Sequence, residues 1–203
     1  MTRVVRVWTK EEPFLGTEMA EVTLSEDRLS AKCTAIGVNP LPYRLEYELE
    51  TAEGFVTARL WVRTEGMGWT RELDLTRGSS GLWSSKTDSG GSVELPGLER
   101  DPDMDSVAGA LDCDLGLSPL TNSMPVLRHR LHEGGGPVDF LMAWVSVPDL
   151  AVHASRQRYT FLRRESGARV VRYESRGGNF VSDLRFDDDG IVIDYPKLAR
   201  RIG

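Results

Sequence analysis

The sequence predicts a mainly β fold: a long, curved antiparallel meander of roughly fifteen strands that forms a half-barrel or pseudo-barrel. Three observations predict it. Apolar and polar residues alternate with a period of two, glycine-rich turns separate these runs, and patterns of helical length are scarce. A sheet this long must curl or close, because strands twist and open edges aggregate. We therefore expect the curved sheet to enclose a ligand cavity.

The clearest alternation is at residues 43–50, where tyrosines and leucines alternate with charged residues. In a strand, this pattern puts the apolar set on one face and the charged set on the other. Similar runs predict strands at residues 55–63, 158–163 and 170–175. Glycine-containing turns are predicted at residues 53–54, 65–68, 78–81, 89–91, 133–136 and 187–190. They recur at intervals of roughly 8 to 14 residues, which is typical of hairpins.

The middle of the chain departs from this pattern. Residues 96–108 are polar, acidic and contain proline, which predicts a long surface loop. A short strand is expected at residues 110–115. The best candidate for a helix follows at residues 118–125, with Ser118 as N-cap, Pro119 at the first helical position and Pro125 ending the run.

Length and charge limit the classes of function. The length of 203 residues fits a single β domain spanning residues 1–203. The net charge of the chain is −6. An acidic chain repels phosphate backbones, so we expect no nucleic-acid partner. Local arginine pairs are interpreted as solvated strand faces.

The two cysteines, Cys33 and Cys113, are too few for a disulfide framework and are expected to be small buried hydrophobes. The first ten residues lack the apolar core of a secretory signal, and no apolar run is long enough for a transmembrane segment. We therefore expect a cytoplasmic protein. No cofactor is expected, because phosphate-binding glycine motifs are absent from the sequence. No metal site is expected either, since His129 and His132 would point to opposite faces of a strand.

One segment carries a family resemblance. Residues 111–128 combine a strand with two aspartates, a Ser-Pro-Leu-Thr-Asn run, a proline and then a basic end. Further matching pieces lie at residues 43–47, 158–160, 173–175, 180, 187–190 and 194–201. In order and spacing they resemble the glycolipid-binding family of bacterial proteins, first catalogued as a domain of unknown function.

The resemblance implies a long antiparallel sheet wrapped around a single short helix. It also implies an acidic pocket, a homodimer, and a lipid-like or glycolipid-like small-molecule ligand. These implications concern nearly the whole chain.

Asp112 and Asp114 are the first candidates for ligand binding. Two residues apart on a strand, they share one face with Cα atoms roughly 6.5–7 Å apart. They could accept hydrogen bonds from sugar hydroxyls, or act as acid and base in glycoside chemistry. They could also be two exposed acids at a strand end.

Six further residues complete the candidate ligand site. Thr121 and Asn122 could bind head-group hydroxyls or bond the local backbone. Arg44 and Glu46 share the polar face of their strand, which faces either a wet cavity or solvent. Tyr159 and Tyr173 could line an amphipathic site, although most aromatic residues of a β protein belong to its core.

We thus expect non-catalytic binding of a lipid or glycolipid in an acidic pocket, in bacterial glycolipid or cell-envelope metabolism, with no catalytic residue assigned. One alternative is an enzyme that acts on a sugar-containing lipid through Asp112 or Asp114. Another is a dimeric interaction protein whose core is filled by side chains.

Overall fold

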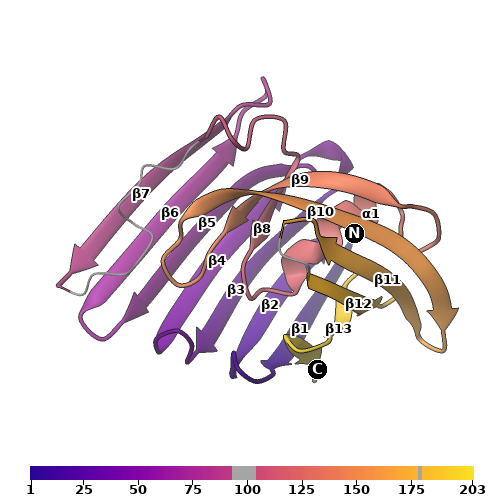
Figure 1. The fold of residues 1–203 in the computed structure, drawn as a ribbon, viewed down its shortest axis with the longest axis horizontal. Coiled ribbons are helices and arrows are strands. Elements are labelled where there is room, and N and C mark those ends of the chain that lie inside the picture. Colours follow the sequence, from indigo (N-terminus) through magenta and orange to yellow (C-terminus); the bar gives the residue numbers. More distant parts are fainter. Residues whose placement is uncertain (93–103, 178–179) are drawn as a thin grey trace.

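A single sheet dominates the computed structural model, which describes residues 1–92, 104–177 and 180–203. Fourteen strands of this described part form one sheet in the order β7-β6-β5-β4-β3-β2-β1-β14-β13-β12-β11-β10-β9-β8 (Figure 1). The sheet is not closed, and β7 and β8 are its edges. The predicted mainly β fold with a curved meander is confirmed. Most of the surface loop predicted at residues 96–108 lies outside the described residues.

The first half of the sheet consists of β1 (Thr2–Lys10), β2 (Gly16–Leu24), β3 (Leu29–Gly37), β4 (Tyr43–Thr51), β5 (Thr57–Gly66), β6 (Trp69–Arg77) and β7 (Trp83–Gly91). The second half consists of β8 (Asp112–Leu115), β9 (Val138–Val145), β10 (Val152–Glu165), β11 (Ala168–Ser175), β12 (Phe180–Phe186), β13 (Val192–Tyr195) and β14 (Ala199–Arg201). β1 and β14 pair antiparallel and join the halves.

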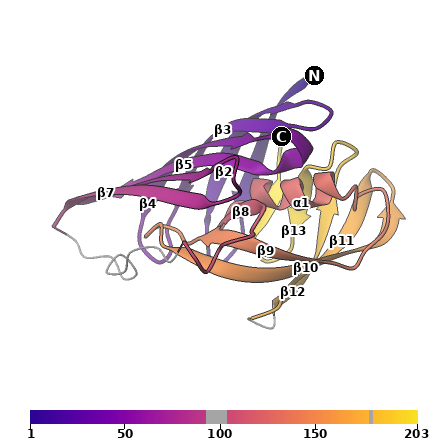
Figure 2. The ribbon, with the colours of Figure 1, turned by 90° about the horizontal axis from the view of Figure 1, so that it is seen from above.

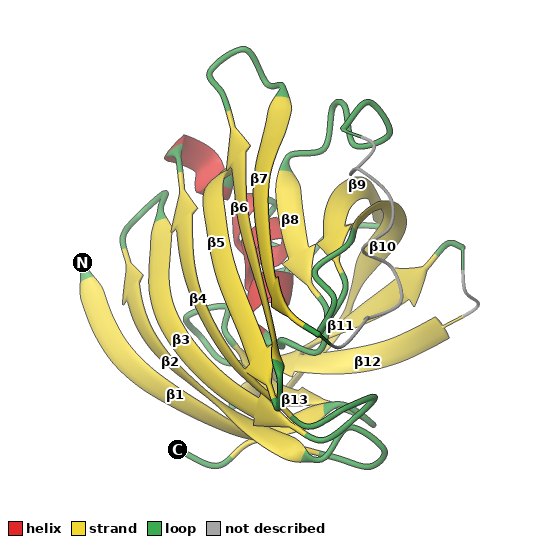
Figure 3. Cartoon of the chain, turned by 90° about the vertical axis from the view of Figure 1, so that its left-hand side faces the viewer, coloured by secondary structure: helices red, strands yellow, loops and turns green. Residues whose placement is uncertain are grey.

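The sheet curves so that its two halves face each other. Seen from above, the arm containing β3, β5 and β7 lies on one side, β9 and β10 lie on the other, and α1 (Ser123–Arg128) lies between them (Figure 2). The same curve is visible in Figure 3, which looks at the left-hand side of Figure 1, where β7 lies. Residues 123–127 of this short helix are all buried. Within the described part of the chain, the implied single short helix inside the sheet is therefore confirmed.

One edge strand departs from the predicted antiparallel pattern. β8 pairs parallel with β9, because the chain passes through α1 before it returns as β9. The start of β8 reaches the opposite arm, where the backbone N–H of Thr57 donates to the carbonyl of Leu111 at 2.9 Å. The sheet is therefore mixed at this edge.

Two predicted local boundaries were wrong. The strand predicted from residue 55 begins at Thr57, because Phe55 belongs to the 3₁₀ turn η1 (Glu53–Phe55) and has a positive φ of 58°. The turn predicted at residues 89–91 is part of β7, paired with residues 69–71. Glycine is required there for close approach, since a Cβ on Gly91 would lie 2.0 Å from the Gly68 carbonyl oxygen.

The helical segment also differs from its prediction. A 3₁₀ turn, η2 (Leu120–Asn122), precedes α1, and Pro125 lies inside the helix rather than ending it. Proline is tolerated there because the first turn of a helix has no intrahelical acceptor for its N–H groups. The Ser118 hydroxyl donates to Glu18 at 2.7 Å instead of capping the helix.

The core fills much of the curve. Trp8 is fully buried, and its indole N–H donates to the carbonyl of Val192 at 2.9 Å, which ties β1 to β13. No described helix has the length and apolar character needed to cross a bilayer. That residues 1–203 form one domain stays a prediction.

Aromatic side chains cover glycines at two hairpin ends, and one pair gives a stability prediction. Gly66 lies opposite Trp69, and a Cβ on Gly66 would lie 2.4 Å from the indole nitrogen. Gly66→Ala should therefore lower the free energy of unfolding by about 1–3 kcal/mol, because the buried ring must move. Urea unfolding measures this change. Gly177→Ala is the matched control, since a Cβ there would meet nothing within 4 Å. An equal decrease in the free energy of unfolding for both variants would contradict the packing of Trp69 over Gly66.

Candidate functional site

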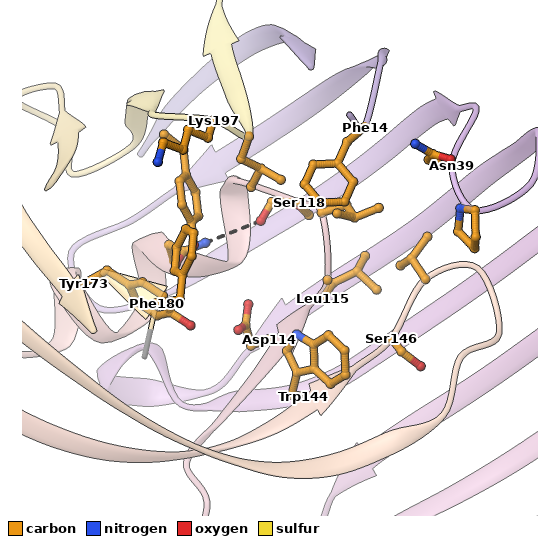
Figure 4. A pocket seen from close by; sticks show the side chains of 17 residues that line it. Phe14, Asn39, Asp114, Leu115, Ser118, Trp144, Ser146, Tyr173, Phe180 and Lys197 are labelled. Carbon is orange, nitrogen blue, oxygen red and sulfur yellow. Dashed lines mark hydrogen bonds between the residues drawn. The ribbon is translucent and has the colours of Figure 1, made fainter. Parts of the chain in front are cut away.

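A cavity of about 500 Å³ lies between the two arms, beside η2 (Figure 4). This volume falls within the range of small-molecule pockets. Its lining side chains come mainly from loops at one end of the sheet, from the end of β8 and from β9, β11, β12 and β13. They are Phe14, Asn39, Pro40, Asp114, Leu115, Gly116, Leu117, Ser118, Asn122, Trp144, Ser146, Val147, Tyr173, Phe180, Tyr195, Lys197 and Leu198.

Asp114 provides the polar floor of this cavity. It lies on the edge strand β8, and its carboxylate accepts hydrogen bonds from Gln157 Nε2 at 2.6 Å and Thr121 Oγ1 at 2.9 Å. Burial raises the pKa of the Asp114 carboxyl. The two hydrogen bonds oppose this shift, and the charge of Asp112 adds to it. Both donors fix the orientation of the carboxylate while it points toward the cavity (Figure 4).

Asp112 has a different role from Asp114. It is fully buried, does not line the cavity, and forms a bidentate ion pair with Arg128 at the end of α1. Arg128 Nη1 lies 2.6 Å from Asp112 Oδ1. Burial raises the pKa of the Asp112 carboxyl, and the guanidinium opposes this shift. This pair anchors the helix to β8.

Thr121 and Asn122 lie on η2, directly beneath the cavity. Thr121 orients Asp114, whereas Asn122 itself lines the cavity. The Asn122 side-chain oxygen accepts from the Tyr159 hydroxyl at 2.9 Å, and its amide nitrogen makes only long contacts of 3.4 and 3.5 Å with backbone carbonyls. That nitrogen is therefore available as a donor to a ligand.

Tyrosine and phenylalanine rings form one wall. The Tyr159 and Tyr173 ring centroids lie 5.3 Å apart, and Tyr173 lies 6.0 Å from Phe180 and 6.1 Å from Tyr195. Tyr173, Phe180 and Tyr195 line the cavity, while Tyr159 lies behind them and is buried. Burial raises the pKa of the Tyr173 hydroxyl. The wall is thus apolar, with neutral hydroxyl groups at its edge.

The structure does not bring Arg44 and Glu46 to this cavity. Both are exposed on β4, on the face opposite to the buried Tyr43, Leu45 and Tyr47. They border a separate hollow of about 260 Å³. Of the eight candidate ligand residues, the structure gathers Asp112, Asp114, Thr121, Asn122, Tyr159 and Tyr173 around one place and leaves these two outside it.

Sequence reasoning missed a second buried polar group behind the cavity. Glu18 accepts hydrogen bonds from the hydroxyls of Tyr47 at 2.9 Å and Ser118 at 2.7 Å, and Lys10 Nζ lies 3.8 Å from its other oxygen. Burial raises the pKa of Glu18 and lowers that of Lys10, while their attraction opposes both shifts. Ser118 connects this group to the cavity. The period-two pattern of β2 contained the signal, because Glu18 shares the inward face with Ala20 and Val22.

The described residues offer no cluster of three or more His, Cys, Asp or Glu side chains that could hold a metal ion. His129 and His132 are not on a strand as predicted. They follow α1, where His129 ends the helix and packs edge-on against Phe140 with centroids 5.2 Å apart.

The raised pKa of Asp114 predicts a pH dependence of stability. An unfolded aspartate titrates near pH 3.9, and the folded group titrates higher, so the native state binds more protons between these two values. The contribution of Asp114 to stability is therefore present below about pH 4 and is lost as pH rises through the folded pKa. Asp114→Asn should flatten the decline of the unfolding free energy above pH 4. Urea unfolding at a series of pH values measures this, and parallel curves for the two proteins would contradict it.

Comparisons with known proteins agree with this architecture. A family model described as "Putative glycolipid-binding" matches residues 5–201. The crystal structure of a DUF1089 family protein from Pseudomonas aeruginosa is similar at a TM-score of 0.66 and 27% identity, covering 91% of this chain and 92% of that one. Among curated proteins, no match was found.

Proposed function

Because the chain belongs to the glycolipid-binding family, whose model spans residues 5–201, we propose that its cavity binds an amphipathic lipid with a neutral sugar head group. The head group lies against Asp114 and Asn122, and the apolar part lies along Phe14, Trp144 and Val147. One observation carries this proposal: a single oriented carboxylate forms the floor of an otherwise largely apolar, aromatic cavity of about 500 Å³.

The chemistry of the floor favours hydroxyl groups over phosphate. At pH values above its raised pKa, the Asp114 carboxylate accepts hydrogen bonds from hydroxyls and repels a phosphate. Asn122 adds a donor, and the hydroxyls of Tyr173 and Tyr195 add two groups that can both donate and accept. Aromatic rings also suit the apolar faces of sugars and acyl chains.

The lining favours binding over glycoside hydrolysis. Two-carboxylate hydrolysis places both acids beside the scissile bond. Among the described residues that line the cavity, Asp114 is the only carboxylate, and Asp112 is engaged by Arg128. A cavity of this size equally disfavours an interaction protein with a completely filled core.

The setting we propose is bacterial glycolipid or cell-envelope metabolism, with a cytoplasmic homodimer. The cytoplasm is supported by Cys33 and Cys113, which are both free and buried. The dimer rests on the family resemblance.

Native mass spectrometry of protein purified from a bacterial host tests the function. We expect a bound lipid whose mass includes one or more hexoses, and a raised melting temperature when glycolipid extract is added to delipidated protein. If only phospholipid is retained, and glycolipid extract leaves the melting temperature unchanged, the proposed ligand class is wrong.

A further inference from the structure

The cavity opens at one end of the sheet, where four of the described loops meet. Its lining includes Phe14 from the β1–β2 loop, Asn39 and Pro40 from the β3–β4 loop, Val147 from the β9–β10 loop and Lys197 from the β13–β14 loop. The first residue of β12, Phe180, completes the border.

Hydrogen bonds hold these loops together. Asn39 Nδ2 donates to the carbonyl of Pro13 at 2.6 Å, which ties the β3–β4 loop to the β1–β2 loop. The backbone N–H of Glu11 donates to the carbonyl of Leu198 at 2.9 Å, which ties in the β13–β14 loop. The border of the opening is therefore an organised surface.

Large apolar side chains are exposed on this border. We call four of them the apolar rim: Leu15, Val38, Leu41 and Phe180, with exposed fractions of 46%, 48%, 37% and 40%. Leu15 and Leu41 directly adjoin loop residues that line the cavity, but they do not line it themselves. Exposed apolar groups gathered around a pocket usually mark a binding surface.

Two loops at the opposite end of the strands are strongly charged. Residues 25–28 read Ser-Glu-Asp-Arg and residues 187–190 read Asp-Asp-Asp-Gly. Exposed apolar side chains are present at this end too: Met1 before β1, Leu82 in the β6–β7 loop and Leu111 before β8 have exposed fractions of 85%, 66% and 38%. The apolar rim is therefore distinguished by its place around the opening of the cavity, where Phe180 lines the cavity and Leu15, Val38 and Leu41 adjoin lining residues.

We infer that the apolar rim docks on the surface of a lipid bilayer, so that the lipid passes between bilayer and cavity without crossing water. This inference rests on the proposed function, because a bilayer is where an amphipathic lipid is found. The rim is continuous with the cavity, so the acyl part of the ligand meets apolar surface throughout its path.

Charge favours a neutral bilayer as the occupant. The chain has a net charge of −6, which repels anionic lipid surfaces. Around the opening, the acidic Glu11 and Glu12 are offset by Lys197 and Arg200, and Glu11 lies 3.5 Å from Arg200. Attraction therefore comes from burial of the apolar rim rather than from basic residues.

Co-flotation with vesicles of phosphatidylcholine alone tests the docking. The wild-type protein should float with the vesicles, and Leu41→Asp should reduce the bound fraction by roughly tenfold, because a charge replaces a side chain that would be buried. Leu15→Asp should also reduce the bound fraction by roughly tenfold. This second variant keeps the test valid if Leu41→Asp does not fold. Leu82→Asp is the matched control, because Leu82 is exposed at the end of the strands away from the opening, and it should float like the wild type.

Binding of monomeric octyl glucoside separates docking from the proposed function. Leu41→Asp should bind octyl glucoside like the wild type but float less with the vesicles. Asp114→Asn should float like the wild type but bind octyl glucoside more weakly. The inference would be overturned if Leu41→Asp floats with the vesicles as well as the wild type does. It would also be overturned if Leu82→Asp reduces the floating fraction as much as Leu41→Asp does. A wild-type dimer that Leu41→Asp converts to a monomer without changing flotation would overturn it too, because the rim would then cover a second copy of the chain.

Discussion

Replacing Arg128 by alanine should lower the free energy of unfolding by about 3–5 kcal/mol, since removing one partner leaves a buried charge uncompensated. Arg128 and Asp112 form a bidentate pair, and their side chains are only 11% and 1% exposed. The guanidinium also lies 5.7 Å from the centre of the Phe140 ring, so its removal costs packing as well. Urea unfolding monitored by tryptophan fluorescence measures the change.

A second bidentate pair is the control. Arg158 donates to Asp139 at 2.8 and 2.7 Å, but on the exposed surface, so Arg158→Ala should change stability little. Removing both buried charges, in the double variant Asp112→Leu with Arg128→Met, should recover most of the loss. If the urea concentration at the midpoint of unfolding is the same for Arg128→Ala and the wild type, the ion pair of Arg128 and Asp112 does not anchor α1 to β8.

Replacing Asp114 by asparagine should weaken the binding of octyl glucoside by about 10- to 100-fold. A hydrogen bond to a charged group contributes roughly 1.5–3 kcal/mol, and each 1.4 kcal/mol is tenfold in affinity. Asparagine has nearly the same shape and can still accept from Thr121, so the fold should persist. Equilibrium dialysis below the micellar concentration measures the affinity.

Glu46→Gln is the matched control for this prediction. Glu46 lies on β4 on the outer face and borders a different hollow, so its variant should bind octyl glucoside like the wild type. If Glu46→Gln loses affinity and Asp114→Asn does not, the ligand binds the outer face of the first arm.

The fold could be predicted because its pattern is local. Leu45 and Leu49 alternate with charged residues, and such alternation assigns each strand two faces without knowledge of its neighbours. The parallel pairing of β8 could not be predicted in this way. It depends on where the chain after α1 enters β9. A strand of four residues such as Asp112–Leu115 has no sequence pattern that distinguishes parallel from antiparallel pairing.

The candidate site could be predicted only in part. Asp114, Thr121 and Asn122 are close in sequence, so one family-like segment indicated all three. Glu18 and Ser118 meet only through the fold, 100 positions apart along the chain. The outward placement of Glu46 could not be decided either, because the sequence does not say which face of a strand looks into the curve.

Titrating the wild-type protein with octyl glucoside and with octyl phosphate tests the central claim most directly. The two ligands share their apolar chain and differ in head group, so their ratio of affinities measures selection by the floor around Asp114. The account predicts that the glucoside binds at least about tenfold more tightly, a difference of roughly 1.4 kcal/mol. Equal affinity for both ligands, or tighter binding of the phosphate, would contradict it.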